Sequence, residues 1–508
     1  MKKIISLLLV LCLSFGLAVT ANADQGEKVI VAIGADPQNI GPFQGMSLGR
    51  IGVLYTTYEM LCVTVGGEIQ PVLMKDYEQV DELTYNVNLY DYIYDQAGNH
   101  LTAEDVKWCY DTAKEMGNLP KLTAIESVEV TGDYSLQFKF TTLAIGDLGA
   151  LWMECPIVTR AAYEASPDGM AIDPVSTTAY KLTEYVSGSK FVYEYTGNYW
   201  QTDERLVNPY GKHNVNTIEF DVIADSTQLA NALKTRAIDV TVQLTDTDVE
   251  DFVGQDGFTV SSVPDNLIMF LSFNCDETQG MFYNNPDARK AIAYAIDANM
   301  IAQGAYNGNA KVLTAWGHDK YSDYVADWAN NEYYSYDLAK AQELAKSSGL
   351  EGKTVRLLVV NLEQQTRVAT IIQAFLSQIG VTCTIEQYDS QLFGTYKYET
   401  DKYDIVLDTL GSTAYLVNVW ATAFDEANYT HGGTFNFVHD DQLQALLDEA
   451  TATDGHTAEQ MDAFNAYMAE QLYSYALVEP MVNIAHTDTI KTLLTDCRIQ
   501  INAGGSEY

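Results

Sequence analysis

The chain has 508 residues, 47% of them hydrophobic, which is enough for two or more domains with substantial cores. Its 29 Lys and Arg residues are outnumbered by 69 Asp and Glu residues, which gives a formal net charge of −40. Such a charge argues against nucleic acids and anionic membranes as partners, and it is typical of a solvated acidic coat that keeps a protein soluble.

The amino terminus has the pattern of a secretory signal peptide. Lys2 and Lys3 precede an apolar run from Ile4 to Val19, and the small-residue triplet Ala21-Asn22-Ala23 follows. This order predicts a signal peptide over residues 1–23, with cleavage after the triplet. We therefore expect a soluble protein that is secreted across the cytoplasmic membrane and is periplasmic or associated with the cell envelope.

Further along, strand and helix patterns alternate. Thr102 suits an N-cap, and the acidic residues after it suit a first turn, so a helix is predicted to begin there. The apolar residues of 134–140 alternate with period two, as in a strand. The spacing of apolar residues over 288–296 predicts an amphipathic helix.

A βαβ unit is predicted in the second half of the chain. Thr354–Val360 is a β-branched apolar run typical of a buried strand. Apolar residues then recur at helical spacing from Val368 to Ile379, Gly380 ends the helix, and residues 381–385 alternate as a second strand. Two strands joined by a helix are parallel neighbours, so the fold class is α/β.

Catalytic and metal-binding patterns are weak in this chain. Gly45-Met46-Ser47-Leu48-Gly49 matches the G-x-S-x-G pattern of hydrolases, but the loop-like segment before it is not the strand that a nucleophile elbow needs. We therefore predict no enzyme and no catalytic residue, and keep an exported serine hydrolase as a distant alternative. The cysteines form no C-x-x-C pair, and no cofactor or bound metal is predicted, although His431 and His439 leave a metal complex as an alternative ligand.

Several segments, taken in order, resemble a family of exported binding proteins. Gly67–Leu73 is similar to its "dG-x-l-x-P-x-L" segment, Leu101–Val106 to its "L-T-A-x-D-V" helix start, and Pro286–Asp297 to its "D-x-R-V-R-x-A-l-x-x-A-I-D" helix. Weaker matches are Leu233–Val240, Phe273-Asn274, Tyr336–Ala341 and Tyr403–Val406. Each match is weak by itself, but together they resemble the extracellular solute-binding proteins of peptide and nickel importers, the bacterial family 5 type.

The resemblance implies a two-lobe periplasmic-binding-protein fold of class II, similar to cluster C, with an extra subdomain in lobe I. It places lobe I at 24–266, with the subdomain at about 51–171. Lobe II would follow at 267–482, and 483–508 would return to lobe I. The chain would cross between lobes at 263–273 and near Pro480. In this fold Asn274 and Arg289 are expected to be framework residues, and Arg289 is expected to make a buried ion pair.

The ligand would lie between the lobes, where this chain departs from the family pattern. Thr177 and Tyr180 remain from the family's "G-T-G-P-Y" turn. In peptide binders, an Asp that pairs with the peptide's α-ammonium group follows a strand like Tyr403–Leu407, whereas this chain has Thr413 or a neighbour there. The residues that the resemblance implies for ligand binding are Thr177, Tyr180, Trp316, Gly411, Ser412, Thr413, Tyr415 and Trp420.

The function implied is that of the extracytoplasmic binding component of an ABC importer. It would capture a peptide or peptide-like ligand and deliver it to the permease subunits in the membrane. An oligosaccharide or a metal complex in the same scaffold is the alternative. We expect a monomer with no nucleic-acid partner.

Overall fold

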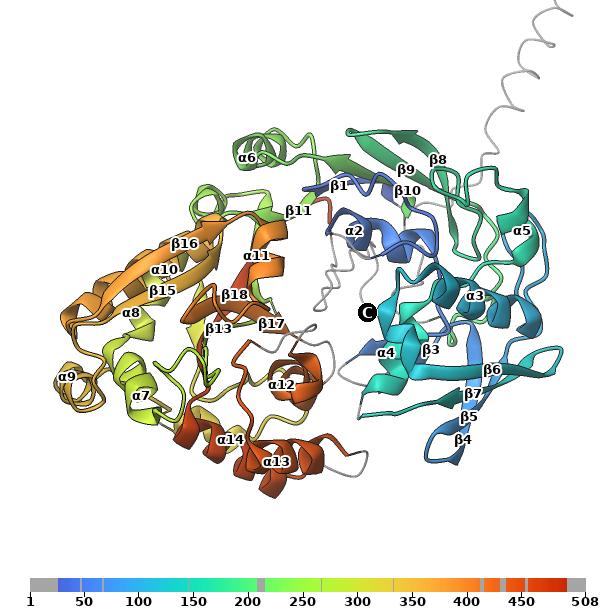
Figure 1. Cartoon of the computed structure of the whole chain (residues 1–508). Helices are drawn as coiled ribbons and strands as arrows, with labels where there is room; N and C mark the ends of the chain where they lie inside the picture. Colours follow the sequence, from blue (N-terminus) through green and yellow to red (C-terminus); the bar gives the residue numbers. More distant parts are fainter. Residues whose placement is uncertain are drawn as a thin grey trace, which may run out of the picture.

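The structure is a computed structural model that describes residues 26–490 except for 46–47, 66–67, 145, 208–214, 266, 332, 412–414, 430–434 and 453–455. The predicted signal peptide lies outside these residues. Figure 1 shows two lobes side by side, one coloured blue to green and the other mainly yellow-green to red. Among the described residues, no helix has both the length and the apolar character to cross a membrane.

The yellow-green to red part, lobe II, has a sheet in the order β16-β15-β17-β13-β18, with β14 also paired to β18. Helices α7–α14 pack with this sheet around one large apolar core. The strands are β13 (Leu267–Phe273), β14 (Ala310–Val312), β15 (Thr354–Val360), β16 (Thr382–Tyr388), β17 (Ile405–Gly411) and β18 (Ser474–Thr487). The helices are α7 (Pro286–Ala295), α8 (Ala298–Tyr306), α9 (Leu338–Ser347), α10 (Glu363–Gln378), α11 (Ser390–Tyr396), α12 (Leu416–Phe424), α13 (Asp441–Thr451) and α14 (Ala458–Gln471).

The predicted βαβ unit is confirmed. Strand β15 has the predicted bounds and pairs in parallel with β16. Helix α10 starts earlier than its first apolar residue, at Glu363, which supplies an acid to the first turn. Gly380, just after the helix, has φ +74°, a left-handed conformation that glycine adopts without strain.

The sheet of lobe I continues from the same β18 in the order β11-β1-β10-β9-β8. Strand β1 is parallel to β10 and β11, whereas the β10, β9 and β8 pairs are antiparallel. The elements of this sheet are β1 (Gly26–Ile33), β8 (Tyr180–Val186), β9 (Lys190–Tyr195), β10 (Val215–Val222), β11 (Val240–Leu244) and β12 (Phe258–Pro264), with helices α2 (Leu48–Thr57) and α6 (Ser226–Lys234).

A subdomain with its own apolar core is attached to this sheet. Its four-stranded sheet has the order β4-β5-β7-β6, and a separate pair is formed by β2 and β3. As predicted, a helix, α3, begins after Thr102; both the backbone N–H and the hydroxyl of Thr102 donate to the Asp105 carboxylate. The elements are β2 (Cys62–Val65), β3 (Glu68–Pro71), β4 (Met74–Asp81), β5 (Thr84–Leu89), α3 (Ala103–Met116), β6 (Ile125–Gly132), β7 (Ser135–Phe140), α4 (Asp147–Glu154) and α5 (Arg160–Ala165).

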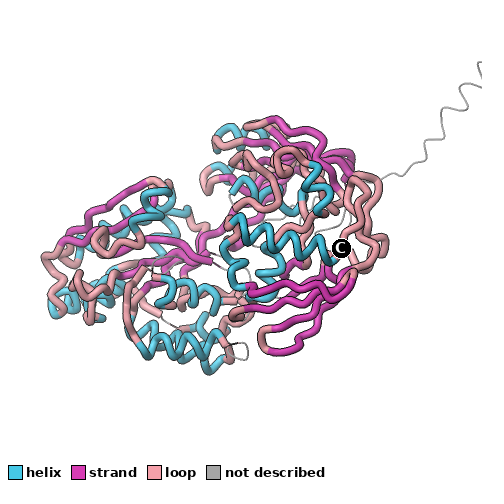
Figure 2. The backbone as a smooth tube through the Cα atoms, turned by 45° about the vertical axis from the view of Figure 1, so that its right-hand side comes forward, coloured by secondary structure: helices cyan, strands magenta, loops and turns pink. Residues whose placement is uncertain are grey.

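The two lobes are joined by strands that cross between them. Strand β18 pairs with β13 of lobe II through its first half and with β12 and β11 of lobe I through its second half. Strands β12 and β13 follow one another directly, so the second crossing lies beside the first, with Pro264 opposite Met481. Figure 2 shows these strands as magenta tubes running between the lobes.

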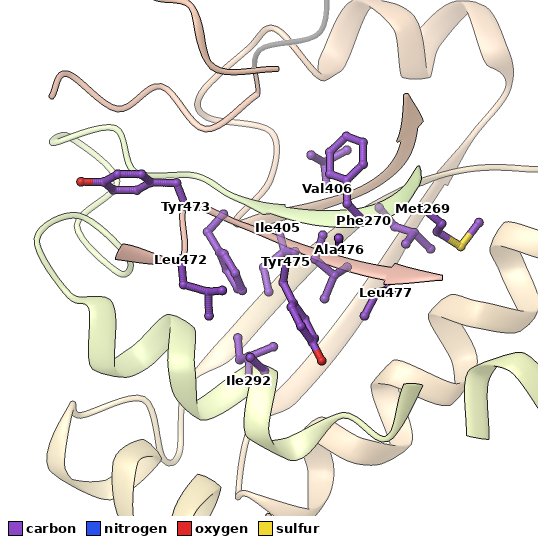
Figure 3. Packing of buried hydrophobic residues seen from close by; sticks show 14 of the residues in the cluster. Met269, Phe270, Ile292, Ile405, Val406, Leu472, Tyr473, Tyr475, Ala476 and Leu477 are labelled. Atoms are coloured by element: carbon purple, nitrogen blue, oxygen red, sulfur yellow. The ribbon is translucent and has the colours of Figure 1, made fainter. Parts of the chain in front are cut away.

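The core of lobe II surrounds β13 and β18, whose apolar side chains are shown with those of α7 and β17 in Figure 3. Arg289 of α7 is buried beside this core, as expected of a framework residue. Its partners differ from the expectation: the guanidinium donates to the carbonyl oxygens of Gln471 and Phe282, and the described residues show no carboxylate paired with it. The predicted ion pair is therefore wrong, because backbone carbonyls at the end of α14 and before α7 take its place.

Candidate site at the junction of the two lobes

The predicted ligand contacts Gly411 and Tyr415 lie at the end of β17 and directly before α12. Gly411 ends β17 at an exposed position, opposite Leu267 of β13. Ser412 and Thr413, two predicted ligand contacts, lie outside the described residues. Tyr415 is half-buried at the residue before α12.

Asp323 fixes the start of α12. Its carboxylate accepts the N–H groups of Leu416 at 2.7 Å and Val417 at 3.0 Å, two groups that have no partner within the helix. Burial raises the pKa of Asp323, although these two bonds stabilise its charged form. The backbone next to Tyr415 is therefore well anchored in lobe II.

The ring of Tyr415 meets lobe I at Gly146, the residue before α4. A Cβ atom placed on Gly146 would lie 2.6 Å from Cδ2 of Tyr415 and 3.0 Å from Oδ1 of Asn418. Burial raises the pKa of the Tyr415 hydroxyl, and the carboxylate of Glu68 on β3 raises it further. Tyr415 thus faces two elements of the lobe I subdomain, α4 and β3.

The other side of the junction, near the crossing strands, contains a network of amide side chains around Asp246. This residue follows β11 in lobe I, and its carboxylate accepts from Asn309 at 2.8 Å, Asn483 at 2.9 Å and Gln364 at 3.0 Å. Asn309 and Gln364 belong to lobe II, and Asn483 lies on the crossing strand β18. Carboxylate bonds of this kind are stronger than neutral ones, so Asp246 connects the lobes where the chain crosses.

Two of the predicted aromatic contacts, Trp316 and Trp420, are fully buried in the core of lobe II. The indole N–H of Trp420 donates to the Trp316 carbonyl at 2.8 Å, and its ring stacks on Phe464 at 4.2 Å. In this structure both rings therefore pack against lobe II itself, and contact with a ligand stays a prediction for them.

Tyr180 and Thr177 lie in lobe I, whereas Tyr415 lies in lobe II. The hydroxyl of Tyr180 donates to the Val215 carbonyl at 2.7 Å, which ties β8 to β10. Thr177 is buried at the edge of a cavity of about 820 Å³ whose lining residues all belong to lobe I. Burial raises the pKa of Glu59 beside this cavity, and hydrogen bonds from Tyr199 and Trp200 oppose this rise.

Hydrogen bonds within lobe I hold part of the cavity wall. Asp95 accepts from the hydroxyl of Thr159 at 2.6 Å, and the amide of Gln96 donates to the Tyr180 carbonyl at 2.8 Å. The second of these bonds holds the loop after β5 against β8. Of the predicted site residues, the structure thus brings Tyr415 to the junction, leaves Gly411 exposed at the end of β17, and places Thr177, Tyr180, Trp316 and Trp420 in the lobes.

The described residues give no geometric support to the alternatives of metal binding and catalysis. His431 and Ser47 lie outside the described residues, and His439 is an exposed side chain 3.2 Å from the Glu426 carboxylate. Within the described part of the chain, no group of three or more His, Cys, Asp or Glu side chains could hold a metal ion. Strand β1 ends at Ile33, and the described residues between it and Ser47 form no strand.

No local sequence pattern distinguishes Gly146 or Asp246, because their partners are distant in the chain. Gly146 meets residues of α12, more than 250 positions later, and Asp246 meets Asn309, Gln364 and Asn483. A glycine or an acid in a loop has many structural roles, and only the folded chain shows which one applies here.

Comparison with known proteins agrees with this architecture. Residues 68–416, well over half of the chain, match the family described as bacterial extracellular solute-binding proteins, family 5 middle. The dipeptide-binding protein of Escherichia coli (strain K12) is 24% identical over 391 residues, covering 70% of this chain and 69% of that protein. The nickel-binding protein NikA of Staphylococcus aureus is 21% identical over 433 residues, covering 82% and 81%.

The same fold occurs among solved structures. HbpA2 from Haemophilus parasuis superimposes with a TM-score of 0.81 and covers 94% of this chain and 99% of that one, at 18% sequence identity. The predicted α/β two-lobe architecture is thereby confirmed.

Proposed function

The chain belongs to the bacterial extracellular solute-binding proteins of family 5, and on this premise we propose that it captures a peptide or peptide-like ligand between its lobes and delivers it to the permease of an ABC importer. Proteins of this family are solute-binding proteins of ABC importers of the peptide and nickel type, and they are not enzymes. The observation that carries the proposal is the junction itself, where Tyr415 of lobe II meets Gly146 of lobe I while crossing strands join the lobes. A ligand held between the lobes beside this contact would touch both lobes at once.

The proposed lobe boundaries are 24–266, 267–482 and a return over 483–508, with the subdomain at about 51–171. Their support is the distribution of buried apolar residues. The lobe II core runs from Ile268 to Val478, whereas Ala485 and Ile490 belong to clusters of lobe I. Export across the cytoplasmic membrane is part of the same proposal and rests on the extracellular character of the family.

Closure is the first expected result. A ligand that binds both lobes stabilises the closed arrangement and raises the melting temperature by mass action. Native mass spectrometry of the purified protein should identify the ligand that it retains from the expression host. Small-angle scattering with and without that compound should then show compaction, and an unchanged radius of gyration at saturation would contradict the proposal.

The second expected result concerns the class of ligand, because the family resemblance implies that Thr413 or a neighbour takes the place of an Asp of the peptide binders. A hydroxyl cannot replace the charge partner of a free α-ammonium group, and burial of that group without a partner is costly. Di- to tetrapeptides with a free amino terminus should therefore bind weakly, and Thr413→Asp should strengthen their binding. Submicromolar binding of free peptides that acetylation abolishes would count against this expectation.

Calorimetric titration of matched free and N-acetylated peptides provides the measurement, beside a panel of small oligosaccharides and Ni²⁺ with free histidine. The last two arms test the alternatives of an oligosaccharide and a metal complex. The metal arm has a specific motive, since a relative that covers 82% of this chain is named as a nickel-binding protein.

A further inference from the structure

Gly146 and Tyr415 face one another from different lobes. Gly146 precedes α4, whose Leu151 belongs to the core of the lobe I subdomain and whose Leu148 packs against that core. Tyr415 precedes α12 and packs at the edge of the lobe II core. In Figure 1, α4 and α12 lie across from each other, on the opposite side of the molecule's centre from β1 and β11.

The contact depends on the absence of a side chain at Gly146. An added Cβ would lie 2.6 Å from Cδ2 and 3.1 Å from Cε2 of the Tyr415 ring. Carbon atoms in favourable contact are about 3.5–4.0 Å apart, so the nearer approach is short by about 1 Å. Gly146 also has φ +81°, which an L-residue adopts only with strain.

Contacts within lobe II hold the ring and the backbone of Tyr415. The ring of His456 approaches the Tyr415 ring edge-to-face, with the centroids 5.8 Å apart. Its backbone is anchored through the bonds that Asp323 makes to the first turn of α12. A group added at Gly146 would therefore press on a ring that is held in lobe II.

We propose that the Tyr415 ring contacts Gly146 when the lobes are closed, and that this contact sets how far the two lobes close. The proposal rests on lobe closure, which is part of the proposed function, but it does not depend on which ligand is bound. Tyr415 acts here as a positioning residue that stops the movement, in addition to any contact with a ligand. Asn418, whose Oδ1 would lie 3.0 Å from the same added Cβ, completes the surface that meets Gly146.

The test is a distance measurement between spin labels on the two lobes, by pulsed electron paramagnetic resonance, on the purified protein with the ligand that it retains from the expression host. Cysteines introduced at Val80 of β4 and Leu392 of α11 carry the labels, because these two side chains are 52% and 42% exposed. The cysteines at 62, 109, 155, 275 and 383 are buried and react poorly with the label. Cys497, outside the described residues, is replaced by Ser in all variants.

Gly146→Ala is compared with Gly188→Ala as a matched control. Gly188, in the turn between β8 and β9, has φ +71°, but nothing lies within 4 Å of an added Cβ. Both variants carry the same kind of backbone strain, and only Gly146→Ala adds a group to the contact. We expect Gly146→Ala to lose the shortest-distance population of the parent protein, and Gly188→Ala to retain it.

A second substitution, at Tyr415, distinguishes a steric effect at the contact from a local folding defect in Gly146→Ala. Gly146→Ala combined with Tyr415→Ala should recover the short-distance population, whereas Gly146→Ala combined with Tyr415→Phe, which keeps the ring, should not. Equal distributions for Gly146→Ala and Gly188→Ala would overturn the proposal, and so would a parent protein without any population at the label distance of this structure. Failure to find a peptide ligand would bear on the proposed function and leave this measurement valid.

Discussion

Replacing Arg289 with alanine is expected to lower the free energy of unfolding by about 3–5 kcal/mol, because several hydrogen bonds from one buried cation are lost together. The guanidinium is 1% exposed and donates to the Gln471 carbonyl through Nε at 2.8 Å and Nη2 at 2.6 Å. It also donates to the Phe282 carbonyl and lies 4.8 Å from the centre of the Tyr473 ring. Removal leaves carbonyl groups without donors and a cavity beside the core.

Chemical denaturation of the two proteins measures this difference. Arg289→Lys should recover only part of it, because an ammonium group cannot reach both carbonyl oxygens with the fixed fork of a guanidinium. Arg160→Ala is the matched control, since Arg160 forms an exposed i,i+4 pair with Glu164 and should change stability little. A loss for Arg289→Ala no larger than that of the control would show that the guanidinium is not a framework element.

The elements with strong local patterns were predictable from the sequence. β15, α10 and β16 are encoded by contiguous residues, with a β-branched run, helical spacing and a glycine that ends the helix. Strand β7 follows from alternation, since Leu136, Phe138 and Phe140 are the buried residues of that strand. Such patterns reflect which side chains of one segment are buried, so they can be interpreted without knowledge of the rest of the fold.

The site was less predictable, because burial by itself does not distinguish a core from a pocket. Trp316 and Trp420 are large aromatic residues near the expected site, and both are accommodated inside lobe II. Among these three aromatic residues, Tyr415 is the one that contacts the other lobe. Their sequence patterns do not show which of them is a core residue and which lies between the lobes. Arg289 shows the same limit: burial of the cation was foreseen, whereas carbonyl oxygens as its partners depend on how α7 meets the end of α14.

Glu479 is the second residue for which a large effect is expected. It is buried on β18, opposite Lys311 of β14, at the point where the chain approaches the crossing between lobes. Its Oε1 lies 3.4 Å from Nδ1 of His318, whose ring stacks on Tyr321 at 4.2 Å. Burial raises the pKa of Glu479 to about 7; Lys311 and Lys320 oppose this rise, and Asp319 adds to it.

This rise in pKa sets the sign of the pH dependence. In the unfolded chain the carboxyl group titrates near its ordinary value of 4.5, so between about pH 4.5 and 7 the folded protein binds the proton more tightly. The stabilisation is fully present below pH 4.5 and is lost as the pH rises through 7. With about 1.36 kcal/mol for each pKa unit, the contribution of this group amounts to about 3 kcal/mol.

Glu479→Gln should remove this contribution, so unfolding free energies measured from pH 5 to pH 8 should fall by about 2.5 kcal/mol less in the variant than in the parent. Glu351→Gln, at an exposed position, is the matched control and should keep the parent's pH dependence.

The comparison at pH 5 also decides where the proton resides in the pair. If Glu479 is a neutral carboxylic acid there, glutamine is a close replacement in shape and charge, and the variant should be about as stable as the parent. If His318 carries the proton instead, the same substitution would leave a buried imidazolium without its carboxylate, and the variant should be destabilised at pH 5 by about 3–5 kcal/mol. A variant that is much less stable than the parent at pH 5 would therefore contradict the carboxylic acid assignment, and equal stability with a flattened pH profile would support it.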